Sequence, residues 1–99
     1  RFRWLHARDG VQVELLARAT THHSNVAWVA SKEQVIDENW LGPRLGSATR
    51  KRLGDVVLVP REPISFDDAA DTGPFILQCR HGALTDDELD VPLLAMAVK

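Results

Sequence analysis

Cysteine is scarce in this sequence, and its single occurrence, Cys79, excludes several classes of protein. One thiol cannot form an internal disulfide, and it supplies neither a cysteine-rich zinc site nor the second thiol of a redox enzyme. Because a lone cysteine suits a reducing compartment, we expect a cytoplasmic protein. The formal net charge of −2 gives no reason to expect nucleic acid or a membrane surface as a partner.

Long apolar runs and familiar catalytic motifs are missing as well. No apolar run approaches the roughly 20 residues that a membrane-spanning helix needs, and no signal peptide is visible. The sequence has no His-x-x-x-His or Glu-x-x-His pair and no glycine-rich phosphate loop. Its 99 residues, 44% hydrophobic and 26% charged, fit one small globular domain. Since the chain starts at Arg1 and is strand-like at once, we expect a fragment of a larger protein.

The first third of the chain alternates between strand and helix patterns. Residues 1–6 place aromatic side chains on one face at period two, which is typical of a half-buried strand. Asp9 and Gln12 have the spacing of a capping box, and the apolar spacing predicts a helix over 11–19. The continuous apolar run 26–30 predicts a strand covered on both faces. This order fits a βαβ crossover within roughly 30 residues.

Capping residues and apolar runs predict further elements along the rest of the chain. These are helices over 32–39 and 48–53, strands over 56–59 and 75–79, and a short edge strand over 64–66. Ser31 with Gln34 is the capping box of the first of these helices, and Gly42 with Pro43 ends it. The acidic loop over 67–74 is rich in turn residues, and we expect it to be mobile.

The stretch after residues 75–79 holds His81, the strongest candidate for chemistry. A histidine at the carboxyl end of a buried strand, next to Gly82, is where α/β proteins often place a ligand or catalytic group. Thr85 and Glu88 form the clearest capping box in the chain, so we interpret the Thr85 hydroxyl as a helix cap and not as a nucleophile. The apolar run 91–98 predicts a helix or a strand that lies in an interior.

Other candidate residues have simpler structural explanations. The adjacent histidines of 22–23 diverge on a turn and rarely bind one metal together. The acidic residues of 86–90 could bind a cation, but a solvated first helical turn explains them as well. A buried, inert thiol is the default for Cys79, although neighbouring Arg80 could activate it. From the residues alone, His81 itself can be either a metal ligand or a hydrogen-bonded structural residue.

Several short motifs follow one another in a distinctive order along nearly the whole chain. They are Arg1-Phe2-Arg3-Trp4, Ala27-Trp28-Val29, Ser31-Lys32-Glu33-Gln34, Trp40-Leu41-Gly42-Pro43, Arg52-Leu53-Gly54-Asp55-Val56-Val57, and His81-Gly82-Ala83-Leu84-Thr85 followed by Glu88, Val91, Pro92 and Leu93. This order resembles the closing segment of bacterial members of the type I phosphodiesterase/nucleotide pyrophosphatase family, a branch of the alkaline phosphatase superfamily. The His-Gly motif with its downstream residues is the most specific part of the resemblance.

The resemblance implies a metallohydrolase in which two divalent metal ions, usually zinc, hold a phosphoryl group beside a Thr or Ser nucleophile. The last metal ligand of the family is the histidine of a late His-Gly pair, which corresponds to His81. The implied fold is α/β and alkaline-phosphatase-like, although these residues would read as α+β in isolation. Residues 1–53 would form a cap-like βαβα subdomain, and residues 54–99 the last strands and helix of a core with a larger mixed sheet.

The chain departs from the family pattern in ways that bear on activity. Cys79 stands where the family commonly has glycine, and the nucleophile and aspartate-rich ligand set have no counterpart here. We therefore expect no catalytic residue and no activity in the isolated chain. The remainder of a parent chain would be its partner, and a small phosphate ester the substrate. The alternative is a stand-alone α/β binding or regulatory module in which His81 is structural.

Overall fold

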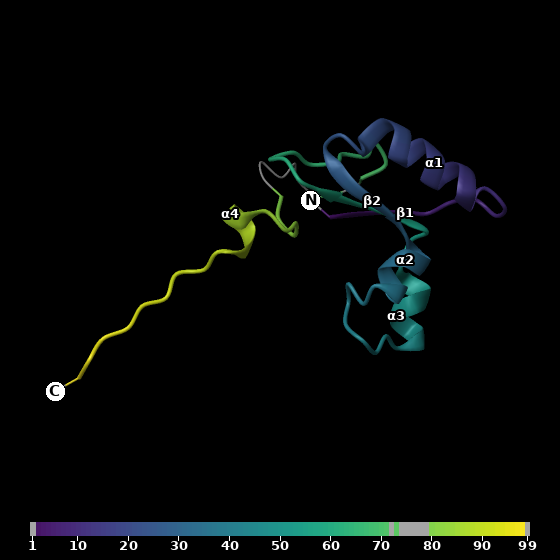
Figure 1. Cartoon of the computed structure of the whole chain (residues 1–99). Coiled ribbons are helices and arrows are strands. Elements are labelled where there is room, and N and C mark those ends of the chain that lie inside the picture. Colours follow the sequence, from purple (N-terminus) through teal and green to yellow (C-terminus); the bar gives the residue numbers. More distant parts are fainter. Residues whose placement is uncertain (1, 72, 74–79, 99) are drawn as a thin grey trace.

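A three-stranded antiparallel sheet lies at the centre of the computed structural model, which describes residues 2–71, 73 and 80–98. The elements in chain order are β1 (Arg3–Leu5), α1 (Gln12–His23), β2 (Ala27–Ser31), α2 (Lys32–Asp37), α3 (Ser47–Arg52), β3 (Val56–Pro60) and α4 (Asp86–Leu89). Helix α1 lies along the sheet, α2 and α3 lie together at one end of it, and the C-terminal segment extends away (Figure 1). The chain is a small mixed α/β unit.

Strand β3 lies between the other two strands and pairs antiparallel with each of them. Strands β1 and β2 are therefore parallel to one another, so the expected strand–helix–strand unit exists as a split βαβ with β3 inserted. All five residues of β3 are buried, which explains its central place and confirms the buried strand predicted over 56–59. The sheet contains strands from both predicted parts of the chain, residues 1–53 and residues 54–99. The division into these two parts stays a prediction.

Each face of the sheet carries its own apolar cluster, because successive side chains of a strand point to opposite faces. The cluster on the α1 side consists of Ala19, Val56 and Leu58, with Leu5, Leu15, Leu16, Val29 and Phe66 around them. The cluster on the other side consists of Ala30, Val35, Val57 and Val59, with Phe2 and Trp4. Strand β2 is not covered on both faces as predicted, because its Trp28 is 46% exposed.

Helix α1 is longer than the predicted helix over 11–19. The hydroxyls of Thr20 and Thr21 donate to the carbonyls four residues earlier, at 2.8 and 2.9 Å. These polar side chains therefore satisfy themselves on the helix and do not end it. The predicted cap at Asp9 is wrong, since the N-cap residue is Val11 and no side chain bonds the first turn.

The elements between the second and third strands agree closely with the sequence patterns. The Ser31 hydroxyl accepts a hydrogen bond from the backbone N–H of Gln34 at 3.1 Å, which confirms the cap of α2. The chain then turns through Asn39 and Gly42, with φ angles of +57° and +95°. The side chains of Arg50, Lys51 and Arg52 on α3 are exposed, as a solvated basic segment should be.

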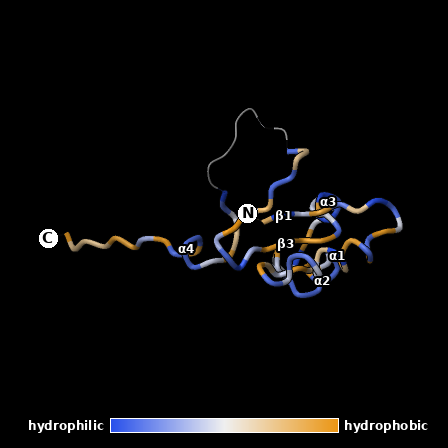
Figure 2. The backbone as a smooth tube through the Cα atoms, turned by 90° about the horizontal axis from the view of Figure 1, so that it is seen from above, coloured by the Kyte–Doolittle hydropathy of each residue, from blue (hydrophilic) through white to orange (hydrophobic). Residues whose placement is uncertain are grey.

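The second half of the chain departs from prediction in two places. Residues 64–66 form no strand, although Ile64 and Phe66 are half-buried. The apolar run 91–98 forms neither helix nor strand, and its large side chains, from Val91 at 82% to Leu93 at 92% exposure, meet solvent. Figure 2 shows this hydrophobic run as an extended tail. Within this chain the run has no interior position, because no described residue packs over it. Within the described ranges, no helix is long and apolar enough to cross a membrane. The predicted strand 75–79 lies outside the described residues.

Candidate site around His81

His81 lies in a surface turn whose backbone requires glycine. Gly82 has a φ angle of +94°, a conformation that side chains with a Cβ rarely adopt. The turn carries the chain from the exposed imidazole of His81 to Ala83, which is only 6% exposed. Gly82 therefore lets an exposed ring and a buried methyl group lie two residues apart. The strand expected just before His81 falls on residues that the structure does not describe.

Glu88 closes the loop that follows Gly82. One of its carboxylate oxygens accepts a hydrogen bond from the Thr85 hydroxyl at 2.7 Å, and the other accepts from the Ala83 backbone N–H at 3.2 Å. Thr85 is the N-cap residue of α4, as predicted, but its hydroxyl makes no bond to the helix backbone. The prediction that this hydroxyl caps the helix is therefore wrong, because it donates to the Glu88 carboxylate instead.

Ion pairs between two arginines and two aspartates connect the start of the His81 segment to the sheet. Arg3 on β1 forms a two-pronged pair with Asp71, with Nη1 donating to Oδ1 at 3.0 Å and Nη2 to Oδ2 at 2.6 Å. Arg80 Nη2 lies 3.8 Å from Asp71 Oδ2, and Arg80 Nε lies 3.3 Å from Asp67 Oδ1. We call these residues the arginine–aspartate network. It connects the residue before His81 to the first strand.

The network perturbs the ionisation of its central members. Hydrogen bonds from Arg3 lower the pKa of Asp71, and the same bonds raise the pKa of Arg3. The two side chains keep exposed fractions of 24% for Arg3 and 39% for Asp71. Since exposed ion pairs are screened by water and salt, the network orients the segment more than it stabilises the fold.

A surface groove of about 530 Å³ lies next to this segment, between the residues that follow β3 and the start of α4. Its lining includes Arg61, Arg80 and the acidic residues of 86–88. Both arginines already have partners. Arg61 donates to the Ser24 carbonyl at 2.6 Å and lies 5.9 Å from the centre of the Trp28 ring, while Arg80 faces the aspartates of the network. The groove is consequently of mixed charge and gives no strong preference for an anion.

The donors needed for a metal centre do not come together among the residues that the structure describes. Catalytic zinc usually takes three protein ligands, and no group of three or more His, Cys, Asp or Glu residues is placed to hold a metal ion. His81 alone does not make such a site. Cys79, the other soft donor considered, lies outside the described residues. A metal at His81 would need its further ligands from elsewhere.

The other histidine pair is structural. His22 and His23 lie in the last turn of α1 and not in the solvated turn predicted for them, and their ring centres are 6.4 Å apart. The His23 ring is half-buried and meets Phe66 edge-on, with 5.3 Å between ring centres. Of the acidic residues of 86–90, Asp86, Asp87 and Asp90 are exposed, which agrees with the solvated turn predicted for them.

Sequence reasoning missed the arginine–aspartate network. The loop containing Asp67 and Asp71 reads as an acidic, mobile turn, and Arg3 reads as the polar side of a strand. Their opposite charges are the only signal available, and the separation of 68 positions between Arg3 and Asp71 leaves the pairing unspecified.

Comparison of the chain with protein-family models, with curated proteins and with solved structures found no match.

Proposed function

We propose that this chain is the C-terminal part of a metal-dependent phosphoester hydrolase of the phosphodiesterase/nucleotide pyrophosphatase type, in which His81 is the last metal ligand. The observation that supports the proposal is the exposed imidazole of His81. It lies on a turn that is held by contacts on both sides, and it belongs to the His-Gly motif that resembles the family. Contacts of Arg80 hold the chain before His81, and contacts of Glu88 hold it after Gly82. A ligand histidine needs such support, because a metal site tolerates little variation in donor position.

In this proposal the chain contributes one donor and no reacting group. A neutral imidazole nitrogen of His81 binds a metal, and bound divalent metals stabilise the attacking and leaving oxygens of phosphoryl transfer. The nucleophile and the other ligands belong to the remainder of the parent chain. The exposed apolar tail of 91–98 supports this division, since such a run is normally covered by another surface.

The test is the variant His81→Ala in the intact parent protein. We expect zinc content and phosphodiesterase turnover to fall together, whereas His22→Ala, an exposed histidine on α1, leaves both unchanged. Metal content is measured by atomic emission after gel filtration, and turnover with an aryl phosphodiester. Unchanged zinc stoichiometry and turnover in His81→Ala would exclude His81 from the site.

A stand-alone α/β binding module is the second candidate, and one observation favours it. The sheet has an apolar cluster on each face, built from residues of this chain alone. A module of this kind should be a soluble monomer that unfolds cooperatively, whereas a fragment should aggregate through its uncovered tail. Sedimentation of the 99-residue chain separates these outcomes. Tight zinc binding by the isolated chain, measured by calorimetry, would contradict the one-donor role proposed for His81.

A further inference from the structure

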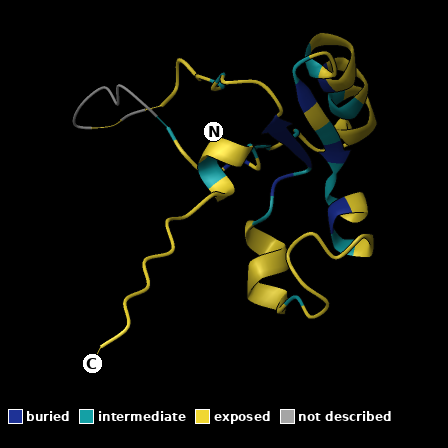
Figure 3. Ribbon diagram, turned by 60° about the vertical axis from the view of Figure 1, so that its left-hand side comes forward, coloured by how far each residue is buried: buried dark blue, intermediate teal, exposed yellow. Residues whose placement is uncertain are grey.

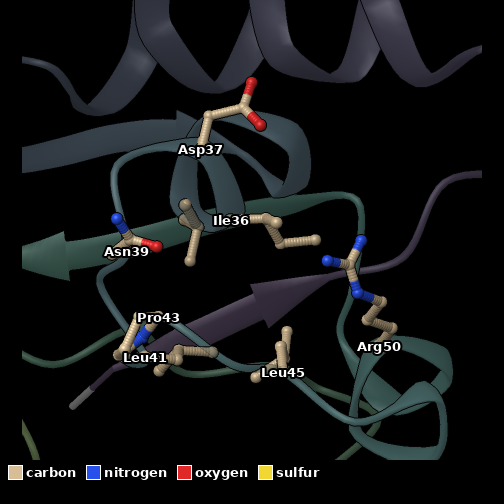
Figure 4. Close-up of a pocket in the computed structure, with 9 residues that line it drawn as sticks. Ile36, Asp37, Asn39, Leu41, Pro43, Leu45 and Arg50 are labelled. Carbon is tan, nitrogen blue, oxygen red and sulfur yellow. The ribbon is translucent and has the colours of Figure 1, made fainter.

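Strand β1 forms one border of the sheet and runs antiparallel to β3, behind the labelled side chains of the small hollow beside α2 (Figure 4). The Leu5 carbonyl accepts a hydrogen bond from the Asp55 backbone N–H at 2.8 Å, so the backbone groups of Leu5 face β3. Because these groups alternate in direction along a strand, those of Phe2, Trp4 and His6 face away from the sheet. Among the described residues, no hydrogen-bonding partner meets them. The outer edge of β1 is therefore open.

The opposite border of the sheet, along β2, is less accessible. Ala27 in that strand is only 2% exposed, whereas Trp4 is half-buried and His6 is exposed. A charged side chain on an edge strand hinders the approach of another strand, but the charge of Arg3 on β1 is already paired with Asp71. Of the two borders, β1 is thus the better template for a further strand.

The tail of residues 91–98 has the properties of such a strand. It contains no charged residue, it is extended, and its large side chains are more than 80% exposed. At about 3.3 Å per residue, it is long enough to cover the stretch 2–6. Pro92 has no N–H, so in a paired strand it must face away from its neighbour. The backbone groups of residues 93, 95 and 97 then face the neighbour, which gives three residues for the three outward residues of the β1 edge.

The tail of a given copy leads away from its own sheet (Figure 1), so a second copy is the occupant that the geometry favours. We propose that the tail 91–98 of one copy adds as a fourth strand to the β1 edge of a second copy, and that the exchange is reciprocal. Main-chain hydrogen bonds and burial of apolar side chains provide the affinity. A two-fold exchange closes at a dimer, and the net charge of −2 opposes it only weakly. This pairing requires no metal at His81.

The experiment measures self-association of the full chain by sedimentation equilibrium at increasing concentration. We expect a reversible monomer–dimer equilibrium. Ala95→Pro removes an N–H that faces β1 in the dimer, once in each of the two contacts, and should weaken dimerisation at least about tenfold. Met96→Pro is the matched control, because the N–H at this position faces away from β1, as at Pro92. It should weaken dimerisation far less, since only apolar contact is lost.

Backbone amide signals in NMR spectra locate the contact. As the concentration rises, the amides of Trp4 and His6 should shift and exchange more slowly with solvent, because they gain hydrogen-bonding partners. The amide of Leu5, which faces β3, should change little. Spectra of the proline variants at low concentration report whether they are folded, and both should be, since no described residue packs over the tail.

Several results would overturn the proposal. A chain that stays monomeric at every concentration would exclude the exchange, and growth beyond the dimer would show open-ended aggregation instead. Equal weakening by the two proline variants would indicate apolar association without strand pairing. Amide changes at Val29 in place of Trp4 would put the contact on β2. Protection of Trp4 that does not depend on concentration would show that the tail folds back onto its own sheet.

Discussion

Two apolar segments of this chain have opposite surroundings. In β3, Val56, Val57, Leu58 and Val59 are each 2% exposed or less, whereas the large apolar side chains of 91–98 are more than 80% exposed. Figure 3 shows the two extremes, with the buried strand in dark blue and the tail in yellow. Both segments have strongly apolar sequences. The difference arises because β3 has a strand on each side and clusters on both faces, while nothing described covers the tail.

The sharpest test of this difference replaces one leucine in each segment. Leu58→Ala should lower the free energy of unfolding by about 2–5 kcal/mol, because a buried leucine leaves a cavity when truncated. Leu93→Ala, at 92% exposure, should change it by less than about 0.5 kcal/mol. Urea unfolding measures both. Similar losses in the two variants would show that the tail is packed in solution.

A glycine pair tests how tightly the sheet itself is built. A Cβ at Gly54 would lie 2.6 Å from the Leu5 carbonyl oxygen, so Gly54→Ala should cost about 1–3 kcal/mol. At Gly46 a Cβ meets nothing within 4 Å, and Gly46→Ala should change stability by less than about 1 kcal/mol. Thermal unfolding followed by circular dichroism compares them. An unaffected Gly54→Ala protein would mean that β1 does not pass this close to residue 54.

Removal of residues 91–98 tests the tail in another way. Since these residues add no contact to the sheet, the truncated chain should keep its helical and sheet signals and its unfolding midpoint within error. It should bind less of a hydrophobic dye and remain monomeric at higher concentration. Dye fluorescence and sedimentation velocity provide the measurements. A lower unfolding midpoint would contradict the separation of the two regions.

The smallest expected effect concerns the arginine–aspartate network. The pKa of Asp71 is lowered from 3.8, so its contribution is complete above pH 3.8 and is lost as the pH falls through the lower folded-state value. Asp71→Asn should remove this dependence and loosen the His81 segment relative to the wild type above pH 3.8. Proteolysis near residue 80 should accelerate, while Asp9→Asn, an exposed change before α1, should not affect it. Equal cleavage rates in both variants would show that the network does not hold the segment.

Local features were predictable from the sequence wherever one short pattern determines the outcome. The run at 56–59 indicated a buried strand, and Ser31 with Gln34 marked a helix start. The extension of α1 was not predictable from polarity, because Thr20 and Thr21 bond their own helix. The sheet order was missed because the pairing of β1 with β3 joins distant residues, such as Trp4 and Val57.

In the candidate site, too, local features were predictable from the sequence and contacts between distant residues were not. The cap position of Thr85 follows from neighbouring residues and was anticipated. The ion pair between Asp71 and Arg3 depends on how the loop that contains Asp71 approaches β1, and no local pattern contains that information. Metal binding at His81 stays a prediction, since no further ligands from this chain gather around a metal position among the described residues.

The central place of β3 has a consequence for the order in which the chain can fold. Strands β1 and β2 do not pair directly, so neither has its sheet partner until residues 56–60 arrive. During synthesis, the first 50 or so residues can form helices but cannot close the sheet, and the slow, long-range pairing waits for the third strand. A ribosome that paused before β3 would therefore expose two unpaired strands at once.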